Sequence, residues 1–217
     1  MTAPFEPAPP ETEDHRDDLR RGGPLPSFYD DLAGSLAEAW RLLVRGAADR
    51  RSPFHTMQVA SIRPDGWPAV RTVVLRGVDP PARTLRFHTD RRAGKLADLA
   101  ADPRVQIHLY DPGRKLQLRL DGLATVHADG PLHAACWAAT RPMGRACYRT
   151  PAAPGQPLDD PSVVIPEPEH ADHGRDRFTV VTVRAETLDW LYLHVAGHRR
   201  ARFDLTGAEP AGTWVGP

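Results

Sequence analysis

The chain has little of several residue types, and each shortage narrows what it can be. Cys136 and Cys147 are the only cysteines among 217 residues, and no Cys-x-x-Cys pair occurs, which supports neither a disulfide framework nor a structural zinc site and favours a reduced, cytoplasmic setting. Lys95 and Lys115 are the only lysines. Acidic and basic residues balance at 28 each, so no overall field draws the chain to nucleic acid or to an anionic membrane.

Long apolar runs and several catalytic motifs are also missing. No apolar stretch approaches the roughly 20 residues that a membrane helix needs. The acidic, proline-rich segment 1–26 has no apolar core, so we expect a disordered arm and no secretory signal there. Gly-x-Ser-x-Gly, His-Glu-x-x-His and Walker-type loops are absent, and His170-x-x-His173 has no further ligands, so hydrolase, nucleotide-triphosphatase and metal sites are not predicted.

The residues that are present predict one domain over about 27–217. Ser27 is the expected N-cap of an amphipathic helix. Two further helices are expected at 91–101 and 131–140, and a long loop at 150–176. The helical spacing after Ser27 involves Phe28, Leu32, Leu36, Trp40 and Leu43.

Between and after these helices the sequence alternates in the way typical of β-strands. Short strands separated by turn signals favour a barrel or a sandwich, so the predicted fold class is mainly β. The expected strands are 55–62, 68–76, 84–89, 104–110, 115–126, 177–185 and 187–195, followed by the basic segment 197–205.

The start of the helix expected near 91 carries an unusual charge. Arg91, Arg92 and Lys95 are cations at an end where the helix dipole is already positive. Backbone N–H groups there, with Thr89 or Asp90 as cap and with added cations, are typical of a phosphate site. Solvated side chains that tolerate a small repulsion are the alternative.

The strand RTVVLR at 71–76 sends its two arginines to opposite faces. Arg71 shares one face with Val73 and Leu75, whereas Arg76 shares the other with Thr72 and Val74. By itself this pattern fits solvent-facing arginines in cross-strand ion pairs. Two later segments, FHTDRRAGK at 87–95 and QLRLDG at 117–122, favour a different interpretation of this strand.

Together the three segments resemble the flavin-binding half of the pyridoxamine 5'-phosphate oxidase-like split barrels. RTVVLR is similar to the family's Arg-x-x-x-Leu-Lys/Arg strand, FHTDRRAGK to its strand end and helix start, and QLRLDG to the strand whose Gln reaches FMN across a dimer interface. Trp190 and Arg202 match a later Trp and Arg in order and approximate spacing. The resemblance covers about 54–205 and implies an FMN-binding split β-barrel.

The resemblance also implies roles for individual residues. Arg71, Thr89 and Lys95 would contact the FMN phosphate. His88 and the strand 72–76 (Thr72, Val73, Val74, Arg76) would line the isoalloxazine and the ribityl chain. Gln117, Trp190 and Arg202 would come from the partner subunit of a homodimer.

At the positions that bind the substrate in the family, this chain has different residues. Arg141 is kept in an Arg-Pro pair, but Trp137 stands at a Tyr position, no Ser is in register, and Arg199-Arg200-Ala201 lacks the His of an Arg-x-His. Arg141 and Arg199 are the candidate substrate residues. An FMN-dependent oxidoreductase acting on a small molecule is therefore expected, with a non-catalytic flavin or haem binder and a deazaflavin-dependent reductase as alternatives.

Overall fold

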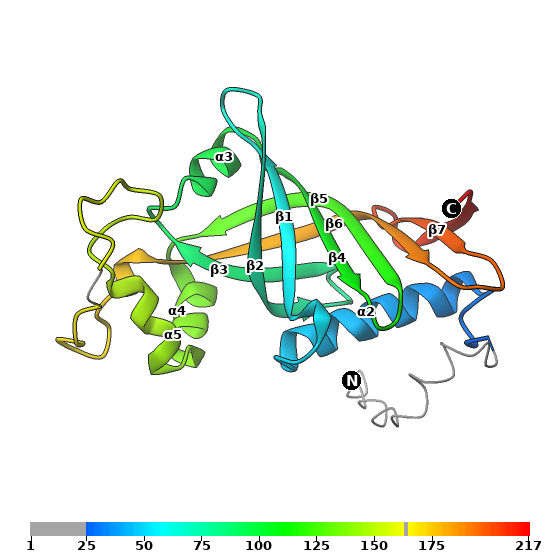
Figure 1. The fold of residues 1–217 in the computed structure, drawn as a ribbon, viewed down its shortest axis with the longest axis horizontal. Helices are drawn as coiled ribbons and strands as arrows, with labels where there is room; N and C mark the ends of the chain where they lie inside the picture. The colour runs from blue at the N-terminus through cyan, green and yellow to red at the C-terminus, as the bar shows by residue number, and fades with distance from the viewer. Residues whose placement is uncertain (1–24, 163–164) are drawn as a thin grey trace.

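The described residues form a β-barrel with helices around it (Figure 1). The structure is a computed structural model that describes residues 25–162 and 165–217. One eight-stranded sheet runs in the order β3-β2-β1-β4-β5-β6-β7-β8, and β3 also pairs with β6, which closes the first six strands into a barrel. The strands are β1 (Thr56–Ile62), β2 (Pro68–Asp79), β3 (Thr84–Asp90), β4 (Arg104–Asp111), β5 (Leu116–His127), β6 (Phe178–Tyr192), β7 (Arg199–Asp204) and β8 (Ala211–Val215).

Alternation of apolar and polar residues explains why these segments are strands. In β4, Val105, Ile107 and Leu109 are buried in the barrel, whereas Gln106 and Tyr110, at alternate positions, point outward. The other barrel strands contribute to the same core, which confirms the predicted mainly β split barrel. The five strands expected between 55 and 126 are all present.

The C-terminal strands differ from the prediction. The segments 177–185 and 187–195 are one strand, β6, which pairs with β3 along its first part and with β7 along its second. Its register with β5 shifts between Asp121 and Gly122, and a Cβ on Gly122 would lie 2.4 Å from the carbonyl oxygen of Arg184. The break in alternation is therefore a bulge rather than a turn. The basic segment 197–205 contains β7, and β8 was not predicted.

The first helix, α2, begins later than expected. It runs over Leu32–Ala48 with Asp31 as N-cap, whose side chain accepts from the N–H of Ala33; Ser27 lies in the preceding turn. Ser27 was predicted because Phe28 fits the helical spacing, yet Phe28 packs against the core from outside the helix, edge-on to Trp190. The buried face of α2 includes Ala39 and Leu43, which join the main core.

A second, smaller core lies outside the barrel. Phe178 and Val180 project from the outer face of β6, and α4 (Gly130–Ala139) packs on them. The helix α5 (Pro142–Ala146), which was not predicted, follows α4 directly. Cys136, Trp137 and Tyr148 complete this cluster, and Cys136 is buried as expected of a small apolar residue.

The long loop after Tyr148 is held by arginine side chains rather than by regular structure. Arg92 donates to the carbonyls of Thr150 and Pro151, and Arg149 donates to the carbonyl of Pro166. In the described ranges, no helix is long and apolar enough to cross a membrane. Almost all of the arm predicted at 1–26 lies outside the described residues.

Candidate functional site

Three of the predicted phosphate residues meet where β2, β3 and α3 (Lys95–Ala101) come together. Lys95 Nζ donates a 2.9 Å hydrogen bond to Thr89 Oγ1 at the end of β3. Burial and the nearby Arg71 guanidinium lower the pKa of Lys95, although Asp90 and Asp98 partly offset this. Arg71 and Lys95, which lie 24 positions apart in the sequence (95 − 71), are thus close enough to repel each other.

Arg71 is fixed by neighbours that the sequence did not reveal. Its Nη1 donates to Ser61 Oγ at 2.7 Å and to the Val59 carbonyl at 3.3 Å, and its Nη2 donates to Asp98 Oδ2 at 3.0 Å. Ser61 and Asp98 are both buried. The inward orientation of Arg71 follows the β2 alternation, since Val73 and Leu75 on the same face are in the barrel core.

The charges at the start of α3 are arranged differently from the prediction. The helix begins at Lys95 with Gly94 as N-cap, so Arg91 and Arg92 lie in the turn before it. Arg92 forms an ion pair with Asp90 at 2.8 Å. Burial would raise the pKa of Asp90, but its hydrogen bonds from Arg92 hold it below the usual value. The positive charge of Arg92 is therefore compensated by Asp90. Its other hydrogen bonds go to carbonyls of the long loop rather than to a phosphate.

The outer face of β2 and β3 carries most of the other predicted flavin residues. Thr72, Val74 and Arg76 share one face as expected, and this face is the outer one. Val73 was also predicted to line the flavin, but it alternates to the inner face and is buried in the barrel core. Arg76 is the extra residue of a bulge, because Leu75 pairs with Phe87 and Gly77 with Arg86. Bulges re-aim side chains and are common beside active sites.

His88 lies on the same outer face and is kept neutral. Its ring packs edge-on against Phe178 with centroids 4.8 Å apart, and its Nε2 is buried without a hydrogen-bond partner in the described part of the chain. Burial, and then the charges of Arg86 and Arg76, lower the pKa of His88 to about 4. Arg86 was not singled out from the sequence, although its place two residues before His88 puts both on one face.

The residues expected from a partner subunit lie on another part of the barrel. Gln117 and Arg202 both point outward; Gln117 Oε1 lies 3.2 Å from His108 Nε2, and Arg202 donates to Asp189. Trp190 instead lies wholly inside the core, where it stacks on Tyr192. A fully buried ring cannot reach a ligand, so the structure contradicts the predicted flavin contact of Trp190.

The two candidate substrate residues are at opposite ends of the chain's barrel. Arg141 is the exposed residue before α5, whereas Arg199 begins β7, at the other side of Figure 1. Arg199 forms an ion pair with Asp30 at 2.6 Å and lies over the ring of Tyr29 at 4.2 Å. The fold therefore does not bring Arg141 and Arg199 together within one chain.

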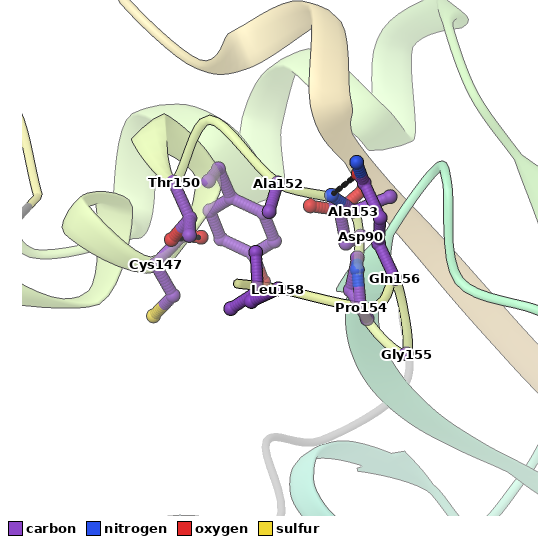
Figure 2. Close-up of a pocket in the computed structure, with 10 residues that line it drawn as sticks. Asp90, Cys147, Thr150, Ala152, Ala153, Pro154, Gly155, Gln156 and Leu158 are labelled. Atoms are coloured by element: carbon purple, nitrogen blue, oxygen red, sulfur yellow. Dashed lines mark hydrogen bonds between the residues drawn. The ribbon is translucent and has the colours of Figure 1, made fainter. Parts of the chain in front are cut away.

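A pocket of about 360 Å³ lies between the end of β3 and the long loop (Figure 2). Asp90 lines it, whereas Thr89 faces Lys95 on the other side of the strand. Tyr148, Pro154 and Leu158 supply much of its apolar wall. Apart from Asp90, which was one of the two expected helix caps, none of the predicted site residues lines this pocket. Within the described residues, no group of three or more His, Cys, Asp or Glu could hold a metal ion.

Comparison with known proteins finds similarity to one family over part of the chain. Residues 37–128 match the family model described as pyridoxamine 5'-phosphate oxidase, FMN-binding domain. The pyridoxine/pyridoxamine 5'-phosphate oxidase of Cupriavidus necator is 31% identical over 129 residues, which are 58% of this chain and 59% of that protein. The corresponding protein of Rubrobacter xylanophilus is 34% identical over 90 residues, which are 42% of this chain and 40% of that protein. The matches thus span less than two thirds of these relatives' length.

Solved structures share the fold at lower identity. A pyridoxamine 5'-phosphate oxidase-related, FMN-binding protein from Nostoc punctiforme superposes with a TM-score of 0.68 at 24% identity, covering 89% of this chain and 100% of that one. PhzG from Burkholderia lata, solved in complex with tetrahydrophenazine-1-carboxylic acid, gives 0.67 at 20% identity, covering 89% and 98%. The motifs, the matched segment and the closed barrel agree: residues 37–128 resemble the FMN-binding domain of the pyridoxamine 5'-phosphate oxidase family, and the fold is that of the pyridoxamine 5'-phosphate oxidase-like split barrels.

Proposed function

We propose that this protein binds FMN and anchors the FMN phosphate at Arg71, Thr89 and Lys95. The observation that carries this proposal is the junction of β2, β3 and α3, where Arg71 is held by Ser61 and Asp98 and Lys95 donates to Thr89. Burial and then the nearby charge of Arg71 lower the pKa of Lys95 there. Two like charges held together in a partly buried place favour a dianion between them. The matched FMN-binding family model supports the same ligand.

The residues around this anchor have distinct tasks in the proposal. Arg71 and Lys95 donate hydrogen bonds to the phosphate, and Thr89 keeps Lys95 in place through its hydroxyl. The outward residues of β2 and the neutral His88 line the ring system. His88 Nε2, buried without a partner among the described residues, is free to exchange a hydrogen bond with a ring heteroatom. When bound, FMN supplies the two-electron redox chemistry, and the protein supplies orientation.

A homodimer completes the proposed site. The outward face of the barrel carries polar residues directly opposite one another on neighbouring strands. Several of them are already linked, since Asp189 accepts from Arg119, Arg200 and Arg202. We propose that a second copy packs on this face and presents Gln117 and Arg202 to the flavin of its partner. The row across the strands consists of Gln58, His108, Arg119, Asp189 and Arg202.

The proposed reaction is oxidation or reduction of a small organic molecule other than pyridoxamine 5'-phosphate. The curated relatives are named as pyridoxine/pyridoxamine 5'-phosphate oxidases, but their likeness covers only part of each chain. Trp137, which stands at one of the family's substrate positions, donates a hydrogen bond from its indole N–H to Asp172. Arg145 lies over the Trp137 ring and donates to the carbonyls of Trp137 and Thr140. These side chains serve the local structure, so a different substrate is expected.

The first test is the visible absorption spectrum of the purified protein, with mass spectrometry of the small molecule released on denaturation. About one FMN per chain supports the proposal. A protein that is colourless and takes up no added FMN contradicts it, and tight binding of a deazaflavin without affinity for FMN would favour that cofactor. Rapid reduction of the flavin by an amine donor or NADPH, followed by its reoxidation by an acceptor such as dioxygen, identifies an enzyme, whereas a bound but silent flavin identifies a carrier.

A further inference from the structure

Ser61, Arg71 and Asp98 form a closed triangle of hydrogen bonds from three different elements. Ser61 is on β1, Arg71 on β2 and Asp98 on α3. Ser61 Oγ donates to Asp98 Oδ2 at 2.7 Å, and Arg71 donates to both of them, at 2.7 Å and 3.0 Å. Ser61 is 3% exposed and Asp98 is 7% exposed, so the two residues that hold Arg71 are buried.

The triangle uses only part of the Arg71 guanidinium. A guanidinium has five N–H groups. Both on Nη1 and one on Nη2 are bonded to Ser61, Val59 and Asp98. The Nε–H and the second Nη2–H have no hydrogen bond within the described residues, so they remain available to an acceptor. Arginine loses much rotamer freedom when it is held in one place, and here Ser61 and Asp98 hold it before any ligand arrives.

We propose that Ser61 and Asp98 are positioning residues, which hold Arg71 with its unused N–H groups directed at the phosphate of the cofactor. This inference rests on the proposed FMN site. Neither residue touches the phosphate in this proposal, and both act through Arg71. Preorganisation of this kind raises affinity because the ordering is completed before binding.

For Asp98, a purely electrostatic role and a positioning role predict opposite effects on phosphate binding. The Asp98 carboxylate reduces the positive charge of the site, so its loss should strengthen phosphate binding if only charge mattered. If Asp98 positions Arg71, its loss should weaken phosphate binding. Ser61 carries no charge, so Ser61→Ala tests positioning without an electrostatic change.

The experiment measures the dissociation constants of FMN and of riboflavin, which lacks the phosphate, for each variant of the full chain. We expect Ser61→Ala to lower the preference for FMN over riboflavin by about tenfold, with riboflavin affinity unchanged. Ser61→Thr, which keeps the hydroxyl, should retain the preference. Asp98→Ala should lower it as well. An increased preference in Asp98→Ala would overturn the positioning role of Asp98.

A double-mutant cycle shows whether the effect passes through Arg71. In an Arg71→Ala background, Ser61→Ala should change the FMN preference no further, because there is no guanidinium left to position. A tenfold loss that persists in that background would mean that Ser61 acts on the structure in general. If the unmodified protein shows no preference for FMN over riboflavin, the proposed phosphate site itself fails; if it shows the preference but Ser61→Ala keeps it, only the positioning inference fails.

Discussion

The indole N–H of Trp137 donates a 2.7 Å hydrogen bond to the Asp172 carboxylate, which lies 35 residues further along the chain. This bond joins α4 to the end of the long loop. Arg145 strengthens the same junction, because it lies over the Trp137 ring at 4.7 Å and donates to the Ala171 carbonyl. The bond from Trp137 is the main reason that the pKa of Asp172 lies below its usual value.

Trp137→Phe should therefore loosen the loop without emptying the cluster beneath it. The phenyl ring keeps much of the apolar contact, but the donor to Asp172 is lost. We expect proteolytic cleavage within 165–174 to become several-fold faster, measured by limited proteolysis with mass spectrometry. Trp214→Phe, on β8 and partly exposed, is the control and should leave the cleavage rate unchanged. Equal rates in wild type and Trp137→Phe would show that the bond does not hold the loop.

Phe178→Ala should remove the centre of the smaller core. Its ring is fully buried and contacts the rings of His88, Trp137 and Tyr148. Truncation of a buried Phe typically costs about 3–5 kcal/mol of unfolding free energy. Urea unfolding measures the loss.

The matched control for Phe178→Ala is Met143→Ala, because Met143 is 89% exposed. This change should alter the unfolding free energy by no more than about 0.5 kcal/mol. A small loss in Phe178→Ala would mean that the helices α4 and α5 are held to the barrel by other contacts.

His88 should make stability depend on pH below neutrality. Burial and the two neighbouring arginines lower its pKa to about 4 in the folded protein, from 6.5 in the unfolded chain. Between these values the unfolded state binds the additional proton, so stability falls as the pH drops from 6.5 to 4. The full difference of about 2.5 pK units corresponds to at most about 3 kcal/mol.

Denaturant unfolding at several pH values checks this dependence. His88→Gln cannot take up the proton, so its stability should vary less with pH between 6.5 and 4.5 than that of the wild type. NMR titration of the His88 ring measures the pKa directly. A titration midpoint near 6.5 in the folded protein would contradict the burial of a neutral imidazole.

Arg71→Ala and Lys95→Ala should each weaken FMN binding. A charge-assisted hydrogen bond contributes about 1.5–3 kcal/mol, so each change should raise the dissociation constant by about 10- to 100-fold. The double variant should not retain FMN through purification. Flavin fluorescence titration gives the constants, and Arg51→Ala, whose side chain is 96% exposed, is the charge-matched control. Unchanged flavin stoichiometry in a folded double variant would falsify the phosphate site.

Local patterns were sufficient for much of the fold. The barrel strands follow from period-two alternation, because one face of each strand is buried and the other is not. The same alternation predicted that Arg71 and Arg76 leave β2 on opposite faces, which is confirmed; the structure adds that Arg71 points inward and Arg76 outward. Helix boundaries were less accurate, since Phe28 fits a helical period but packs from a turn. The continuity of β6 was missed because a bulge and a turn interrupt alternation alike.

The sequence by itself determined the barrel and the identity of its cation-bearing segments, because alternation and short motifs are local properties. Only the tertiary structure decided which arginine and lysine side chains keep hydrogen-bond donors for a ligand and which are used within the chain. Asp98 and Ser61 hold Arg71 from 27 and 10 residues away, and Arg92 reaches Thr150 from 58 residues away. Trp190 was likewise assigned to a ligand and lies in the core. Partners of this kind depend on how strands and loops pack together, and that packing sums many weak contacts between residues distant in the sequence.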